Sequence, residues 1–330
     1  MKKKRDRKKR KILLAIIMIL FTAVVLSAST YAWFTANKTV TVESIDVTVS
    51  TSQGLQISAD AANWKSIVTA AEIKGASWTG VVNQIPTSPN TAVPVSTVGT
   101  VTNGKMDMYK GTIETATDGT GDNILTAVKS NETNGTGGDF VAFDLFFQST
   151  IAQTVYLTSN SNVVADGTST GIENATRVAF IKEGSVDPGS TAAQAQQITG
   201  SQSTMIWEPN YDVHTANGVA NALNVYGITT SQTGGTKLNY NGVKAPIAKA
   251  NAIRLNDDDS QYFAAVTTVG SLASGIPETT YINAFTVAAG ITKVRIYMWI
   301  EGQDVDCEDN ASGGSLTYNL QFSINSSSGS

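Results

Sequence analysis

The sequence predicts an all-β fold, an antiparallel β-sandwich of jelly-roll-like architecture with short helical turns in its loops. Short segments in which apolar and polar residues alternate recur along the chain, separated by clusters of Gly, Asn, Asp and Ser. Such alternation places one face of a strand on a core and the other in water. No sustained apolar stripe with a helical period is visible. Strands without long helices, in a chain of 330 residues, favour a sandwich or jelly roll.

The chain begins with a basic run followed by an apolar run. Nine of the first eleven residues are Lys or Arg, and residues 12–26 are mostly aliphatic. A positive region, an apolar stretch and an exit of small residues make up a secretory signal peptide, so residues 1–32 are interpreted as one. An uncleaved membrane anchor is the alternative, because residues 12–34 carry no charge and are long enough to cross a bilayer. In either case we expect the body to be exported, with the positive end remaining inside.

Loss of the leader changes the charge of the protein. The whole chain has net charge −4, but without residues 1–32 it keeps 14 basic and 26 acidic residues, a net charge of −12. So acidic a body offers no basic patch to phosphate groups, and we expect no nucleic-acid partner. Membrane contact is expected only through the leader. The predicted location is secreted, extracellular or at the cell surface, and membrane-anchored if the leader is retained.

Period-2 segments mark the expected strands, and we predict one sandwich domain over residues 51–324. These segments are residues 39–50, 55–58, 141–147, 154–158, 177–182, 262–268, 293–300 and 316–324. We expect the last two to pair as antiparallel neighbours. Helical turns are expected over residues 192–197 and 245–253, which are rich in Ala, Gln and Lys. Residues 83–104 and 115–139 are interpreted as long loops or a small subdomain boundary, and residues 325–330 as a disordered tail.

The strand expected over residues 39–50 belongs to an N-terminal segment, residues 33–50, at the free end of the mature chain. Val40 and Val42 share one phase of the alternation, whereas Ile45, Val47 and Val49 share the other, which indicates a bulge or bend near residues 43–44. This strand has two possible uses. It can be the ordinary first strand of its own sandwich, or it can insert into the open edge of a neighbouring copy as a donor strand. Head-to-tail repetition of that contact yields a filament.

The junction between leader and body resembles that of a known family. Residues 30–35 read Thr-Tyr-Ala-Trp-Phe-Thr, which is similar to the junction of the TasA and camelysin family, Gram-positive surface and biofilm-matrix proteins released by a SipW-type signal peptidase. The resemblance implies cleavage between Ala32 and Trp33, with that signal peptidase as a partner, and assembly by donor-strand addition. It covers only a small part of the chain, and Ala36 stands where an acidic or amide residue is commoner.

These observations predict an exported structural subunit of the cell surface or extracellular matrix, with no enzymatic activity, that associates with itself or with other matrix proteins. The alternative is a cell-surface adhesion or carbohydrate-binding module in which Trp64, Trp78, Trp207 and Trp299 stack on sugars, although large aromatics in a sandwich also pack in its core. Camelysin has been classed as a metallopeptidase, but this chain has no H-E-x-x-H motif and a single His.

One acidic cluster is a candidate cation site. The cluster consists of Asp304, Asp306, Glu308 and Asp309. Their carboxylates could offer oxygen ligands to Ca²⁺, the only cofactor that the sequence suggests. A solvated acidic hairpin loop is the favoured interpretation, because the glycine and glutamate of an EF-hand are not in register. The acidic neighbours of Cys307 would raise its thiol pKa, which favours a free and passive thiol. His214 is interpreted as a loop histidine that is hydrogen-bonded locally.

Overall fold

The computed structural model describes residues 39–50, 54–86, 91–120, 123–249, 253–254 and 259–328. The predicted leader and its cleavage site at Ala32 and Trp33 lie outside these residues. Among the residues described, no helix is long and apolar enough to span a membrane.

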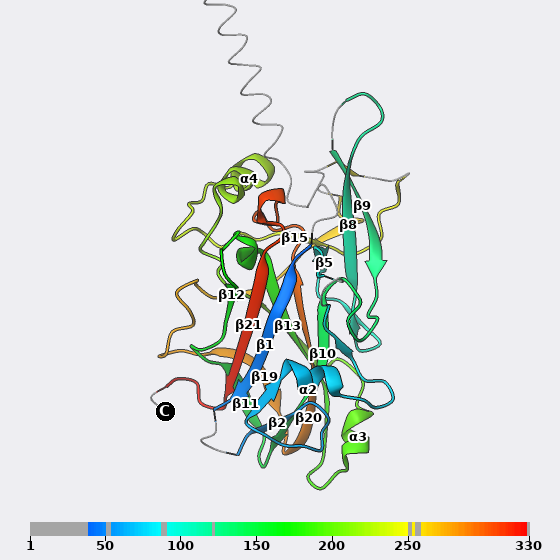
Figure 1. Cartoon of the computed structure of the whole chain (residues 1–330), viewed down its shortest axis with the longest axis vertical. Coiled ribbons are helices and arrows are strands. Elements are labelled where there is room, and N and C mark those ends of the chain that lie inside the picture. Colours follow the sequence, from blue (N-terminus) through cyan, green and yellow to red (C-terminus); the bar gives the residue numbers. More distant parts are fainter. Residues whose placement is uncertain are drawn as a thin grey trace, which may run out of the picture.

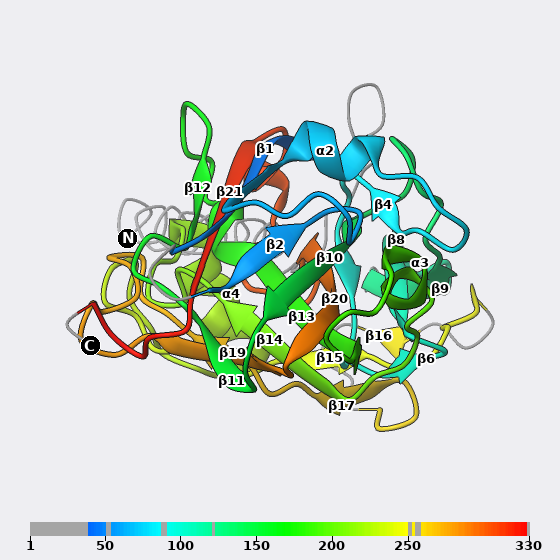
Figure 2. The ribbon, with the colours of Figure 1, turned by 90° about the horizontal axis from the view of Figure 1, so that it is seen from below.

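Two sheets packed face to face form the body of the protein (Figures 1 and 2). The first, here called the β21 sheet, has the order β19 (Ile282–Val287), β11 (Gln153–Leu157), β21 (Ser315–Ser323), β1 (Thr41–Val49) and β3 (Ile67–Thr69), with β12 (Asn162–Ala165) also paired to β21. The second, the β20 sheet, has the order β18 (Val269–Gly270), β14 (Ser203–Glu208), β13 (Thr176–Val186), β20 (Gly290–Ile300), β10 (Val141–Ser149) and β2 (Gln56–Ser58), with β4 (Asn83–Gln84) also paired to β10.

The main core lies between these two sheets and is built from the inward positions of the alternating segments. At its centre, Phe147 of the β20 sheet packs edge-on against Phe285 and Phe322 of the β21 sheet, with ring centroids 4.9 and 5.2 Å apart. Edge-to-face pairs at these separations are favourable beyond the area they bury. The predicted all-β sandwich is therefore confirmed.

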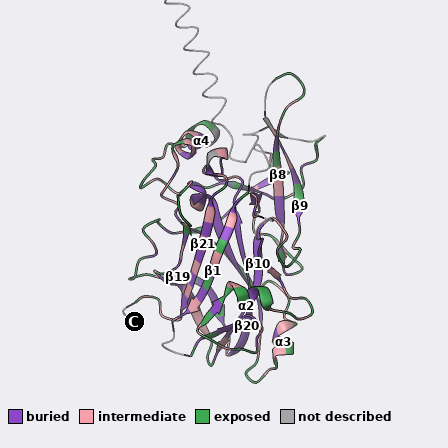
Figure 3. Ribbon diagram, in the orientation of Figure 1, coloured by how far each residue is buried: buried purple, intermediate pink, exposed green. Residues whose placement is uncertain are grey.

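A second layer covers the outer face of the β20 sheet. It contains a four-stranded sheet of β16 (Ile253–Arg254), β9 (Asn123–Ser130), β8 (Met108–Thr115) and β5 (Val95–Ser96), and the two pairs β6 (Val101–Thr102) with β7 (Lys105–Met106) and β15 (Asn241–Val243) with β17 (Phe263–Ala265). Met106, Met108 and Phe140 pack here against Tyr297 and Trp299 of β20. As a result β20 is buried along its whole length (Figure 3), and charged residues on its outer face are buried as well.

The chain passes from one sheet to the other between β19 and β20 within two residues, and this corner depends on Gly290. Its φ of 110° is in the region that favours glycine. A Cβ atom at this position would lie 2.1 Å from the carbonyl oxygen of Val186. The close approach of two backbone segments thus fixes where β20 begins.

Several sequence predictions of strand pairing, loops and helical turns are wrong. The segments 293–300 and 316–324 are not paired: β20 pairs with β10 and β13, whereas β21 lies in the opposite sheet. Residues 115–139, expected to be a loop, include β9. Residues 245–248 are not helical, and Ile247 bridges to Ala127. The expected disordered tail is bonded over part of its length, because the N–H of Tyr281 donates to Ser326 and that of Ser328 to Glu278.

The described helices are short. The predicted turn at 192–197 is confirmed as α3 (Ala192–Gln196), but α2 (Ala70–Gly75) and α4 (Ala216–Tyr226) were not predicted. Two single 3₁₀ turns are η2 (Ile172–Ala175) and η4 (Asp309–Ala311). Thr215 caps α4 by accepting a hydrogen bond from the N–H of Gly218, and Gly227 ends it in the left-handed conformation.

Candidate functional site

The first strand, β1, lies inside the β21 sheet beside the last strand of the chain (Figure 1). It pairs with β21 in parallel, unlike the antiparallel pairs that β21 makes with β11 and β12, and the register shifts between Val42 and Ser44. This confirms the predicted bulge. The shift lets both apolar phases reach the core, so all five predicted residues are buried: Val40, Val42, Ile45, Val47 and Val49.

The two edges of β1 are held unequally. Along one edge it pairs with β21 from Thr41 to Val49. Along the other it pairs with β3 only over Asp46–Thr48, while the N–H of Val40 donates to Ala92 at 2.8 Å. We call the space that β1 fills, between β21 and β3 and over the main core, the β1 slot. One long ladder of hydrogen bonds and five buried apolar side chains hold the strand there. Burial of each side chain contributes roughly 1.5–3 kcal/mol of stabilising free energy.

The acidic loop is buried, so the expectation of a solvated loop is wrong. Its centre is Asp304, which accepts a hydrogen bond from Arg177 at 2.6 Å and one from the backbone N–H of Asp306 at 2.9 Å. Arg177 also donates to Glu208 at 2.9 Å, and its guanidinium carbon lies 5.1 Å from the ring centre of Tyr240. Burial alone would lower the pKa of Arg177, but the charges of Glu208 and Asp304 raise it above its ordinary value.

The expectation that His214 is bonded locally is also wrong. Its Nδ1 lies 2.8 Å from Asp306, which is 92 positions away in the sequence. Asp306 accepts a second hydrogen bond from the N–H of Thr215 at 2.7 Å, and the Thr215 hydroxyl donates to Glu308 at 2.6 Å. Burial lowers the pKa of His214, but the hydrogen bond and charge of Asp306 outweigh burial and raise it. These contacts fasten the start of α4 to the acidic loop.

Three of the four predicted calcium ligands are therefore bound by other groups of the protein. Asp304 faces Arg177, Asp306 faces His214 and Thr215, and Glu308 faces Thr215. Asp309 begins η4. In the described part of the chain, no three His, Cys, Asp or Glu side chains are arranged to hold a metal ion. This geometry supports a structural use of the acidic loop.

The predicted passive state of Cys307 agrees with its surroundings. The thiol is free and fully buried. Burial, and then the negative charges of Asp304 and Glu301, raise its pKa well above the ordinary value. The thiolate, which is the reactive form, is therefore disfavoured.

The four predicted sugar-stacking tryptophans do not share a surface. Trp207 and Trp299 are buried, and their indole N–H groups donate to Ser271 at 2.9 Å and to Glu301 at 3.0 Å. Trp64 and Trp78 are half-buried against a small cluster around Phe146, where the rings of Trp78 and Phe146 are 5.6 Å apart. Of the four tryptophans proposed to stack on sugars, Trp64 and Trp78 are the two that keep exposed surface.

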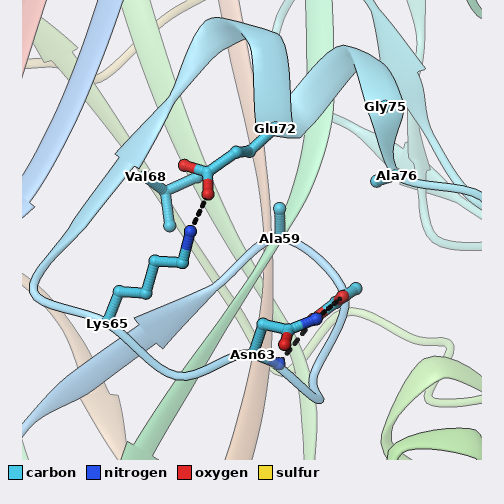
Figure 4. A pocket seen from close by; sticks show the side chains of 8 residues that line it. Ala59, Asn63, Lys65, Val68, Glu72, Gly75 and Ala76 are labelled. Atoms are coloured by element: carbon cyan, nitrogen blue, oxygen red, sulfur yellow. Dashed lines mark hydrogen bonds and ion pairs between the residues drawn. The ribbon is translucent and has the colours of Figure 1, made fainter.

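A pocket of about 280 Å³ opens beside α2 and β3 (Figure 4). The polar groups that line it bind one another: Asp60 accepts hydrogen bonds from Asn63 at 2.6 and 2.8 Å, and Lys65 forms an ion pair with Glu72. Burial raises the pKa of Asp60, but the hydrogen bonds from Asn63, Ala62 and Ser58 lower it to about 2. The lining carboxylates are thus held in place by local partners.

Glu301 makes the stability of the protein depend on pH. Its carboxyl group is fully buried, accepts a hydrogen bond from Trp299 at 3.0 Å, and has its pKa raised by burial from 4.5 to about 7. Because the folded pKa is the higher one, this group stabilises the fold below pH 4.5, and that stabilisation is lost as the pH rises through 7. We expect the free energy of unfolding to fall by on the order of 3 kcal/mol from this group alone. Urea unfolding between pH 4 and 8 measures this fall; an equal pH slope in Glu301→Gln would contradict the assignment.

The fold and the β1 slot define an all-β sandwich protein whose N-terminal strand is held beside its last strand. Comparisons of this chain with protein-family models, curated proteins and solved structures gave no match.

Proposed function

We propose that the protein is an exported structural subunit of the cell surface or extracellular matrix, and that its copies assemble by exchanging β1. The signal-peptide-like start of the chain and the acidic body support export and solubility outside the cell. The junction at residues 30–35, which resembles that of the TasA and camelysin family, supports the same class of function. Assembly rests on the placement of β1.

The observation that carries this proposal is that a strand at the start of the body fills a slot beside the last strand with five buried apolar side chains. Every copy of the protein has the same slot, so the strand of one copy can fill the slot of the next with the same contacts. Only a short stretch of sequence separates β1 from β2 in the opposite sheet, and short connections favour such exchange.

In this exchange each subunit inserts its β1 into the β1 slot of the next subunit and receives the β1 of the previous subunit in its own slot. A contact of this kind does not close on itself, and its repetition produces a filament. The joining energy is the burial and ladder pairing of β1, so the assembly needs no metal or cofactor.

Removal of residues 33–50 tests the proposal. We expect the truncated body to form no filaments, because its slot is empty and it has no strand to give. A peptide of residues 39–50, added in trans, should bind the body in equal amount by filling the slot. The matched control lacks only residues 33–38, keeps β1 and should still assemble. Size-exclusion chromatography and negative-stain imaging give the readout, and unchanged filaments from the body that lacks β1 would refute strand exchange.

A further inference from the structure

Four charged side chains meet inside the protein, on the face of the β20 sheet that points away from the main core. Lys293 and Arg295 belong to β20, Asp144 to β10 and Glu183 to β13. None of the four side chains is more than 5% exposed. Two cations and two carboxylates balance in charge, which is the condition under which ionised groups can be buried.

The amine of Lys293 is held against both carboxylates. Its Nζ lies 2.9 Å from Glu183 Oε2 and 3.3 Å from Asp144 Oδ2, and it donates to the carbonyl oxygen of Ile198 at 3.0 Å. Oδ2 is bonded to Cγ of Asp144, so Nζ also lies close to the carbon that it would attack, and such proximity lowers the barrier to reaction. An amine and a carboxyl group are thus kept together in a site closed to bulk water.

Arg295 and the backbone fix the orientation of the Asp144 carboxyl group. Arg295 Nε donates to Oδ1 at 2.8 Å, and the N–H of Val82 donates to Oδ2 at 3.2 Å. Arg295 is itself positioned by a hydrogen bond to the carbonyl of Gly104 at 2.7 Å. Fixed donors at a carboxyl group stabilise the negative charge that develops on its oxygen when a nucleophile attacks the carbon.

Glu183 is placed to carry protons. The register of β13 against β20 shifts between Lys182 and Gly184, so Glu183 lies at a β-bulge, a feature that is over-represented beside active sites. Burial raises the pKa of Glu183 to about 7, against the lowering effect of Arg295 and Lys293. A carboxyl group of this kind both accepts and returns a proton near neutral pH.

We propose that Lys293 and Asp144 join in an intramolecular isopeptide bond, with Glu183 as the proton carrier and Arg295 as the group that stabilises the intermediate. The Lys293 nitrogen bonds to Cγ of Asp144, and one C–O bond of Asp144 breaks. Of the three protons on the ammonium group, two leave with that oxygen as water, transferred through Glu183. The third stays on the amide nitrogen, where it keeps the hydrogen bond to Ile198. The step requires no oxidant, reductant or cofactor.

The bond would join two neighbouring strands of the β20 sheet, β10 and β20, which are far apart in the sequence. A chain with a single Cys cannot form an internal disulfide, and an amide cross-link restricts the unfolded chain in the same way. This inference is independent of strand exchange.

The intact mass of the purified full-length chain, measured after denaturation, tests the proposal. We expect the wild-type chain to be lighter than its sequence by one water molecule, and a tryptic digest to contain one branched peptide that joins residues 144 and 293. Lys293→Met and Glu183→Gln should both have the full mass of their sequences. Glu183→Gln keeps the size of the side chain and so gives a result even if Lys293→Met does not fold.

The matched control is the surface ion pair between Lys110 and Asp139, whose atoms are 2.9 Å apart while the two side chains are 42% and 24% exposed. In Asp139→Asn the missing water should remain. A folded wild-type chain with the full mass of its sequence would overturn the proposal, and so would a missing water that persists in Lys293→Met.

Discussion

Replacement of Arg177 by Met is expected to lower the free energy of unfolding by about 3–5 kcal/mol, because it leaves the buried carboxylate of Asp304 without its cation and takes from Glu208 the nearer of its two cations, the other being Lys237 at 3.7 Å. Arg177 is fully buried, and its guanidinium contacts Glu208 at 2.9 Å and Asp304 at 2.6 Å. Methionine fills a similar volume, so the loss comes from the unpaired charges and not from a cavity. Urea unfolding at neutral pH measures the change.

A surface ion pair supplies the control for this prediction. Lys249 lies 2.6 Å from Glu114, a distance equal to that between Arg177 and Asp304, but its side chain is 68% exposed. Lys249→Met should therefore cost less than about 1 kcal/mol. Asp304→Asn in the Arg177→Met background should recover part of the loss, because it removes one of the stranded charges. Similar losses in the two single variants would contradict the view that the acidic loop depends on Arg177.

The strands and the bulge in β1 could be predicted from the sequence because both depend on local alternation. Val40 and Val42 could face the same core as Ile45 and Val47 only if the strand slipped by one position between them, and the structure has that slip. The alternation also placed Leu316, Tyr318, Leu320 and Phe322 on one face of β21, and all four are buried.

The choice of neighbouring strands could not be predicted in the same way. Alternation says which face of a strand is buried but not which strand lies beside it, so β20 and β21 were expected to pair although they lie in opposite sheets. A signal for the second covering layer was present: Tyr297 and Trp299 share the outer face of β20 with Lys293 and Arg295. Two large aromatics on that face indicate burial, which makes the neighbouring charges part of an interior network.

The contacts of the acidic loop lay beyond sequence reasoning for a different reason. Its partners, Arg177 and His214, belong to β13 and to the segment before α4, and only the folded chain brings them together. The single His and an Arg inside an apolar strand were the available hints. Without the tertiary contacts, the carboxylates favoured a solvated loop and left a cation site as the second interpretation.

Strand exchange itself can be detected by disulfide trapping between β1 and β21. Ser44 and Thr317 are partners in the parallel ladder, and the Ser44 hydroxyl donates to that of Thr317 at 3.2 Å. Cysteines at both positions, in a chain whose buried Cys307 is replaced by Ala, should oxidise across this pair. If β1 fills the slot of a neighbour, each disulfide joins two chains.

A second pair serves as the control, because it lies wholly within the body. Asn162 of β12 and Asn319 of β21 are also ladder partners, with their side chains 2.7 Å apart. Cysteines there should form disulfides inside single chains whether or not the protein assembles. The decisive measurement is gel electrophoresis without reductant on oxidised, assembled protein: strand exchange predicts a ladder of covalently joined chains for Ser44→Cys with Thr317→Cys, and single chains from the same material would contradict it.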